Sequence, residues 1–366
     1  MDVADSIHME QPSAAQTPST HTAPVEFAGK GGEFFGIWIV NILLSIVTLG
    51  IYSAWAKVRT LQYFYGNTAI DGHRFSYLAT PMQILKGRLL AVALFACYTL
   101  AVSLFPIAGM VFILVMFFLF PWLINQGLRF NLRMSSYRNV RFSFAGSYSE
   151  AFMCFIVLPF VGAITLYLAM PWVLSKIDEY IHSNVKYGDK PLNVSLKAGE
   201  YYITVLLVVA VSVVGFGLIG VIFGASVAGS GFTMGEGTNP TDFVNAASIM
   251  MFVGYMLFIS VISAIYKARI RNHIFNNCEL EGLAKFKSDV KIMPFAMLML
   301  TNTLAIIFTL GLAFPWAKIR QARFMAAATE LELNSNADAV LDTMEEQKAS
   351  FGEEAAEIFD VDVSLG

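Results

Sequence analysis

Charged residues divide the chain into polar stretches separated by long apolar windows. Asp, Glu, Lys and Arg are absent from six windows of 23 residues or more: 34–56, 89–128, 151–175, 201–235, 243–266 and 292–317. A helix needs about 20 apolar residues to cross the roughly 30 Å hydrocarbon core of a bilayer. The pattern therefore predicts an all-α polytopic membrane protein.

The composition excludes several other classes of protein. Hydrophobic residues make up 56% of the chain and charged residues only 14%, whereas soluble domains carry about 25% charged residues. We therefore exclude a soluble enzyme, a secreted disulfide scaffold and a nucleic-acid-binding domain. The three cysteines form no CxxC pair and the five histidines lack paired ligand spacing, so we expect no metal site and no cofactor.

An internal repeat connects distant parts of the chain. Residues 48–59 read TLGIYSAWAKVR and residues 309–320 read TLGLAFPWAKIR, with seven of twelve positions identical. Weaker copies end other apolar windows, so that four of the five tryptophans occupy one repeat position: Trp55, Trp122, Trp172 and Trp316. At the front of the repeat, a glutamate precedes the apolar window in three copies: Glu33, Glu150 and Glu200.

One repeat unit consists of a strand, an apolar segment, the tryptophan, a basic amphipathic helix, an Asn-containing turn and the next strand. Alternating sequences at 74–77 and 140–144 predict short β-pairing outside the bilayer. We therefore expect internal repeats in the membrane, with short β-strands and amphipathic helices in a cytoplasmic layer.

The repeat also defines the expected segments. These are a disordered N-terminal tail at 1–24, a first membrane repeat copy at 25–143, a second at 144–285, a partial third at 286–335 and an acidic tail at 336–366. Residues 330–366 carry eleven acidic side chains against one base, Lys348. We expect the acidic tail to be solvated or to dock a partner.

At the motifs TLGIYSAWAKVR, GGEFFGIWIVN and NTAIDGHRFSY, the chain resembles the YjgN-like family of bacterial inner-membrane proteins. The resemblance covers about 25–330 and leaves out both tails. It implies a multi-pass protein of the bacterial inner (plasma) membrane. It implies no catalytic residue, because the family has no established activity.

Two topologies fit the apolar windows. In the first, every long segment crosses once, giving seven spans and inverted copies, as in many transporters. In the second, only the paired segments cross, and the single segments enter and leave on one face. Cytoplasmic loops carry an excess of Lys and Arg, and 22 of the 24 Lys and Arg lie at unit ends. This bias favours the second topology, with all unit ends in the cytoplasm.

The second topology requires turns within the single segments and connections between the paired ones. The candidate breaks are Asn41, Pro159 with Gly162, and Asn302, because irregular backbone at membrane depth must be shielded by protein. The expected connections between the paired segments are 106–109 and the Gly-rich stretch 225–242.

Six polar residues are candidates for binding a ligand or lipid. Asn41 and Asn302 each lie fourteen residues before a repeat tryptophan. They can line a polar path, or form the interhelical hydrogen bonds common in membranes. Four bases follow the tryptophans at fixed spacing: Lys57, Arg59, Lys318 and Arg320. They suit anionic lipid headgroups, although generic positive-inside charge explains them equally well.

The repeat tryptophans and glutamates have mainly structural interpretations. The tryptophans fit an interfacial aromatic belt better than a ligand cage. The three glutamates fit first-turn acids that favour helix starts, or partners of the bases in neighbouring units.

The leading functional hypothesis is a non-enzymatic inner-membrane protein that transports or handles a small or lipid-like molecule. The alternative is a membrane scaffold that recruits a partner through its cytoplasmic layer and acidic tail. The partners that we expect are membrane lipids, with a protein partner or a homo-oligomer left open and nucleic acid excluded.

Overall fold

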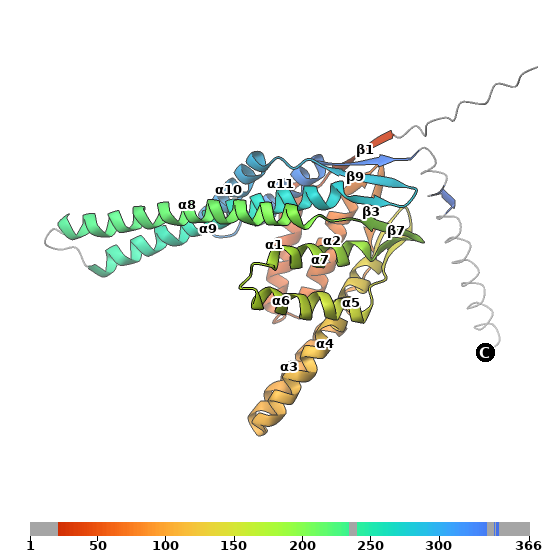
Figure 1. Ribbon diagram of the computed structural model, residues 1–366, viewed down its shortest axis with the longest axis horizontal. Coiled ribbons are helices and arrows are strands. Elements are labelled where there is room, and N and C mark those ends of the chain that lie inside the picture. The colour runs from red at the N-terminus through yellow and green to blue at the C-terminus, as the bar shows by residue number, and fades with distance from the viewer. Residues whose placement is uncertain (1–20, 234–239, 335–339, 341, 344–366) are drawn as a thin grey trace, which may run out of the picture.

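The computed structural model describes residues 21–233, 240–334, 340 and 342–343. A closed barrel of antiparallel strands lies at one end of the molecule, with the strands in the order β1-β10-β9-β8-β7-β6-β5-β4-β3-β2 (Figure 1). The strands are β1 (His21–Phe27), β2 (Thr68–Ile70), β3 (His73–Tyr77), β4 (Ser135–Tyr137), β5 (Val140–Phe144), β6 (Val185–Tyr187), β7 (Lys190–Val194), β8 (Cys278–Leu280), β9 (Ala284–Ser288) and β10 (Thr329–Leu333).

Residues that point into the barrel alternate with residues that point out. Phe286 of β9 and Leu331 of β10 pack in the interior, whereas Lys285, Lys287 and Glu330 lie on the outer face. The period of two follows from the pleat of a strand. The barrel closes because β1 pairs with β10, which joins the two ends of the described chain.

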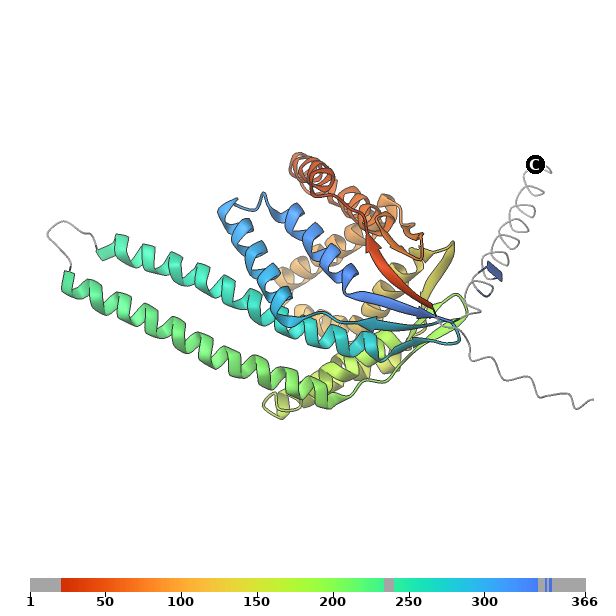
Figure 2. The same cartoon turned by 90° about the horizontal axis from the view of Figure 1, so that it is seen from above.

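Helices leave the barrel and return to it in pairs between the strands. The helices are α1 (Gly31–Val47), α2 (Ser53–Gly66), α3 (Pro81–Leu104), α4 (Pro106–Arg133), α5 (Tyr148–Phe152), η1 (Met153–Val157), α6 (Leu158–Ile164), α7 (Met170–Ser183), α8 (Ala198–Thr233), α9 (Pro240–Asn276), α10 (Ile292–Phe308) and α11 (Phe314–Ala327). The long pairs α3–α4 and α8–α9 project from the barrel in different directions (Figure 1). The pairs α1–α2 and α10–α11 lie side by side (Figure 2).

The three short pairs are α1–α2, α10–α11 and the pair formed by α5, η1 and α6 with α7, and each turns at an apolar tip. At each tip two consecutive residues adopt left-handed backbone, as at Leu49 with Gly50 and at Leu310 with Gly311. Glycine has no Cβ and adopts this conformation without steric cost, which explains why both repeat copies read Leu-Gly there. The side chains of Leu49 and Leu310 are each 95% exposed, and that of Leu166 at the third tip is 83% exposed.

A threonine caps each tip: Thr48, Thr165 and Thr309. Its hydroxyl donates to the carbonyl four residues earlier at 2.6–3.0 Å and accepts from the N–H four residues later at 2.9–3.2 Å. Each cap satisfies a backbone donor at the start of the returning helix. Polar backbone inside a bilayer must be satisfied in this way, because no water is present there.

Four helices among the described residues are long and apolar enough to cross a bilayer: Pro81–Leu104, Ile107–Arg133, Ala198–Val221 and Met251–Asn276. Three apolar helices are shorter: Gly31–Val47, Tyr148–Ile164 and Ile292–Phe308. The seven-span topology places successive unit ends on opposite faces, but β3 and β6 belong to one barrel. The strands at the unit ends thus lie together in one barrel, while the side of a membrane on which this barrel lies, and which segments cross, stay predictions.

Several sequence expectations need correction. The all-α description is too narrow, because the strands form one closed barrel rather than separate local pairs. The N-terminal tail expected at 1–24 lies partly in β1, which begins at His21; residues 1–20 are outside the described part. The joining stretch expected at 225–242 is helical up to Thr233 and again from Pro240.

The breaks expected at Asn41 and Asn302 are wrong, because these residues lie inside α1 and α10. Pro159 is the second residue of α6 and follows the π-helix η1, so the α-helix is interrupted just before it, whereas Gly162 lies inside α6. The chain turns later, at the threonine-capped tips. The repeat itself and the segment boundaries derived from it stay predictions.

Part of the acidic tail contacts the barrel. Val340 packs against the interior cluster, and Asp342 forms an ion pair with Arg138 in the turn between β4 and β5. The described part of the tail therefore lies at the barrel end that carries the hairpin turns. The remainder of the expected tail, at 336–339, 341 and 344–366, lies outside the described residues.

Candidate functional site

A groove between α1 and α2 brings together two of the candidate residues. It has a volume of about 570 Å³, and residues of both helices line it. Its walls are mostly apolar, and its polar side chains include Asn41 and Lys57. The lining residues are Trp38, Asn41, Ile42, Ser45, Ile46, Ala56, Lys57, Thr60 and Leu61.

Asn41 is the unusual member of this groove. Its side chain is only 5% exposed, and its Nδ2 donates to the carbonyl oxygen of Ala56 across 3.4 Å. Its Oδ1 is buried and has no hydrogen-bond partner within the part of the chain that the structure describes. A buried acceptor without a partner lowers the stability of the fold by about 1–3 kcal/mol. A hydrogen bond from a donor outside the chain would therefore be favourable at this position.

Asn302 occupies the corresponding place between α10 and α11. Its side chain is 4% exposed, and its Nδ2 donates to the carbonyl oxygen of Ala317 at 3.2 Å. Here the amide oxygen has a partner, because Arg320 Nη1 donates to Asn302 Oδ1 at 2.9 Å. The same asparagine contact is therefore complete in one hairpin and incomplete in the other.

Two neighbouring positions differ between the hairpins: Tyr52 stands against Ala313, and Val40 stands against Thr301, whose hydroxyl accepts from Arg320 Nη1 at 3.2 Å. Arg59, which matches Arg320 in the sequence repeat, donates to the hydroxyl oxygen of Tyr52 at 3.1 Å. The residue that matches Tyr52 is Ala313, which has no hydroxyl. Arg320 instead lies over the ring of Trp316, 4.5 Å from its centroid, and reaches Asn302. Tyr52 thus holds Arg59 away from Asn41.

The two lysines also differ in their surroundings. Lys57 is exposed at the side of the α1–α2 groove, whereas Lys318 lies 5.4 Å from the centroid of the Phe314 ring. The structure therefore brings Asn41 and Lys57 together around one groove. It brings Asn302 and Arg320 together as an internal hydrogen-bonded pair.

The three repeat glutamates all lie in the first turn of a helix. Glu150 forms a capping box with Ser147, and Glu200 accepts a hydrogen bond from Arg269 at 3.1 Å. Glu33 accepts from the Tyr63 hydroxyl at 3.2 Å. Burial is the main cause that raises the pKa of Tyr63, which keeps this phenol protonated and able to donate. These contacts are structural.

The repeat tryptophans do not converge on one point. Trp122 and Trp316 are exposed and Trp55 and Trp172 are half-buried. Trp55 stacks on Tyr52 with ring centroids 6.1 Å apart. Among the described residues no ring pair joins two of the four, so the geometry does not support an aromatic cage.

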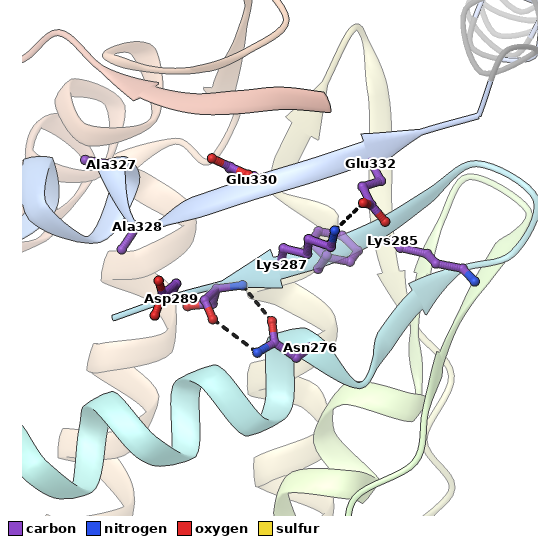
Figure 3. Close-up of a pocket in the computed structure, with 10 residues that line it drawn as sticks. Asn276, Lys285, Lys287, Asp289, Ala327, Ala328, Glu330 and Glu332 are labelled. Atoms are coloured by element: carbon purple, nitrogen blue, oxygen red, sulfur yellow. Dashed lines mark hydrogen bonds and ion pairs between the residues drawn. The ribbon is translucent and has the colours of Figure 1, made fainter. Parts of the chain in front are cut away.

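Two further pockets are polar, and their polar groups largely pair with one another. Figure 3 shows the first, of about 540 Å³, on the outer face of the barrel beside β9 and β10. Lys287 pairs there with Glu332, and Asn276 exchanges two hydrogen bonds with the backbone of Ser288. Charges of both signs that neutralise one another across neighbouring strands are typical of a solvated sheet face.

The second polar pocket, of about 470 Å³, lies where α9 meets the start of α8 and α10. Arg269 donates to Glu200 there, and Asn272 holds the backbone of Val290 through both its amide atoms. Its groups therefore fix the helix ends onto the barrel. Of these three pockets, the α1–α2 groove is the one lined by a residue, Asn41, whose buried side-chain acceptor has no partner in the described residues.

Sequence reasoning found Asn41 and Lys57 but missed the role of Tyr52. The signal was present, because Tyr52 stands against Ala313 in an otherwise closely matching repeat. Within the described ranges, the structure has no group of three or more His, Cys, Asp or Glu side chains placed to hold a metal ion. The expected lack of a cofactor stays a prediction.

Comparisons with known proteins agree with the family suggested by the motifs. The chain is 26% identical over 348 residues to the inner membrane protein YjgN of Escherichia coli O157:H7, covering 83% of this chain and 87% of the relative. It is 25% identical over 375 residues to inner membrane protein YjgN of Salmonella typhimurium, covering 85% and 89%. No solved structure matches the chain.

The model of one protein family matches residues 22–358, which is nearly the whole chain. The resemblance to YjgN-like proteins is thus confirmed. The chain belongs to the family described as bacterial protein of unknown function, DUF898.

Proposed function

We propose that this is an inner-membrane protein that binds a phospholipid in the groove between α1 and α2, at the cytoplasmic leaflet. Its relatives are named as inner membrane proteins, and four of its helices are long and apolar enough to cross a bilayer. The observation that carries the lipid proposal concerns Asn41, which lines the groove together with Lys57. Its Oδ1 is buried and has no hydrogen-bond partner in the described part of the chain.

The three short hairpins are suited to enter a single leaflet. Their tips expose leucines such as Leu49 and Leu310 almost fully, while the threonine caps satisfy backbone groups at each turn. Exposed apolar tips with satisfied backbone are stable in hydrocarbon. The excess of Lys and Arg at the barrel end of the hairpins supports a cytoplasmic barrel.

The length of α1 supports a groove at the depth of lipid headgroups. Asn41 lies eight residues before Leu49, which corresponds to about 12 Å along a helix. One leaflet contributes roughly 15 Å of hydrocarbon. With the tip near the middle of the bilayer, Asn41 and Lys57 lie close to the boundary between hydrocarbon and headgroups.

The groove selects the chemistry of its ligand. Asn41 Oδ1 requires a hydrogen-bond donor, and Lys57 attracts an anion. Trp38, Ile42 and Ile46 offer an apolar wall that continues toward the tip. A phospholipid whose headgroup carries both a phosphate and a donor, such as phosphatidylethanolamine or phosphatidylglycerol, fits all three requirements.

Native mass spectrometry of protein extracted from nanodiscs tests this proposal. We expect retained phospholipid in the wild type, and its loss in Asn41→Leu and in Lys57→Gln. Lys318→Gln is the matched control and should retain the lipid. Nanodiscs of phosphatidylethanolamine, phosphatidylglycerol or phosphatidylcholine distinguish the headgroups, because phosphatidylcholine lacks an N–H or O–H donor. Equal retention in the wild type and Asn41→Leu would contradict the proposal.

Transport of the bound lipid is a further step of the same hypothesis. It predicts that Asn41→Leu abolishes lipid movement between leaflets in reconstituted vesicles while the protein stays folded. The alternative, a scaffold, predicts that this substitution is tolerated and that deletion of 336–366 releases a co-purifying partner. In either case the protein is expected to act without enzymatic chemistry.

A further inference from the structure

The interior of the barrel contains a further cavity, apart from the α1–α2 groove and the two polar pockets. Its volume is about 170 Å³, and aromatic and aliphatic side chains of several strands line it. Its aromatic lining residues are Phe75, Tyr137, Phe142, Tyr187 and Phe286. A ten-stranded barrel is wider than the eight-stranded barrels whose interiors side chains can just fill, which explains why space remains.

The walls of this cavity are apolar even where tyrosines contribute to them. The Tyr137 hydroxyl donates to the carbonyl oxygen of Ile70 at 2.8 Å, and the Tyr187 hydroxyl donates to the carbonyl oxygen of Tyr137 at 2.9 Å. The hydroxyls therefore serve the barrel backbone, and the lining includes no Asp, Glu, Lys, Arg or His. Such a cavity does not suit a charged ligand, because nothing would replace the ligand's water.

Two described residues of the tail contact the end of the barrel that carries the hairpin turns. Val340 packs against the interior cluster, and the Arg138–Asp342 ion pair fixes this segment beside the turn between β4 and β5. A dry apolar cavity of about 150 Å³ is known to bind benzene or xenon.

We propose that the barrel is a binding site for a small, uncharged, apolar molecule of about the size of benzene. The site does not depend on the lipid groove, because the two share no residue. Ala284 lines the cavity with a single methyl group, so that a larger side chain at this position would occupy the space of the ligand.

Thermal unfolding in nanodiscs, with and without benzene, tests this site. At about ten times its dissociation constant, benzene should raise the Tm of the wild type by about 2–5 °C. Ala284→Leu should abolish this rise, and Ala284→Val, which adds less volume, should reduce it. Asn41→Leu should leave the rise unchanged, which separates this site from the lipid groove.

Phe286→Leu is a complementary variant, because it enlarges the cavity without adding bulk. It should lower the Tm without ligand and increase the rise caused by benzene. The proposal is overturned if benzene does not change the Tm of the wild type. It is also overturned if benzene shifts the wild type and the Ala284 variants equally, since that result shows an effect through the lipid.

Discussion

The hairpins α1–α2 and α10–α11 share a turn, a tryptophan and an asparagine, yet the hydrogen bonding of the asparagine side chain differs between them. Arg320 completes the hydrogen bonds of Asn302, while Tyr52 retains Arg59 and leaves Asn41 Oδ1 without a partner in the described structure. Two differences accompany this contrast: tyrosine against alanine at Tyr52, and valine against threonine at Thr301, which also accepts from Arg320. The comparison teaches that closely similar sequence can give a purely structural contact in one place and a candidate binding site in another.

The largest expected effect concerns what the two hairpins share, their tips. Leu49→Lys or Leu310→Lys should each destabilise the protein in nanodiscs by about 2.5–3.5 kcal/mol, the cost of a charge deep in a bilayer. Leu49→Ser and Leu310→Ser are milder controls. Chemical unfolding of nanodisc-embedded protein measures the change. If the tips lie in water, the lysine variants will be as stable as the wild type.

The next prediction contrasts the two asparagines. Asn302→Leu should destabilise the protein by about 2 kcal/mol, because the half-buried Arg320 loses a partner. Asn41→Leu should change the stability of lipid-free protein by less than about 0.5 kcal/mol, because removal of an unsatisfied acceptor offsets the loss of the long hydrogen bond to the Ala56 carbonyl. Unfolding in detergent after removal of lipid provides the comparison. Equal losses in both variants would show that the two sites are equivalent.

A third experiment converts one hairpin into the other. Tyr52→Ala should release Arg59 to donate to Asn41, as Arg320 does to Asn302, and should weaken phospholipid retention about tenfold, the equivalent of roughly 1.4 kcal/mol. Tyr52→Ala combined with Arg59→Gln should restore much of the binding. Native mass spectrometry measures both variants. Retention that does not change in Tyr52→Ala would remove Tyr52 from the explanation.

The smallest effect is expected at the threonine caps. Thr48→Ala and Thr309→Ala should each cost about 1 kcal/mol, the usual loss for a helix cap. Serine at either position keeps the hydroxyl and should recover most of that loss. The same unfolding assay applies. A similar loss in the alanine and serine variants would assign the effect to the threonine methyl group instead of the hydrogen bonds.

Much of the architecture could be predicted from local sequence. Long windows without charge predict the four apolar helices, and alternation at 140–144 predicts β5. Closure of the barrel could not be predicted, because it depends on pairing between β1 and β10, about 300 residues apart in the sequence. Local periodicity carries no information about such a contact.

The candidate site shows the same limit on a smaller scale. Asn41 and Lys57 are recognisable by their spacing from Trp55. The partner chosen by Arg59 depends on which acceptor its side chain reaches in three dimensions, and a repeat alignment does not show this. The positions of the turns were missed for a related reason. Asparagine and proline were expected to break the helices, whereas the chain turns at left-handed residues at the tips, Leu-Gly in two hairpins and Leu-Tyr in the third.

The central claim is that a phospholipid occupies the α1–α2 groove and has no counterpart between α10 and α11. A cryo-EM map of the protein in phosphatidylethanolamine nanodiscs tests it most directly. The account predicts headgroup density within hydrogen-bond distance of Asn41 Oδ1 and close to Lys57, with Arg59 still on Tyr52 and Arg320 on Asn302. A groove without lipid density, with Arg59 turned onto Asn41, would contradict it.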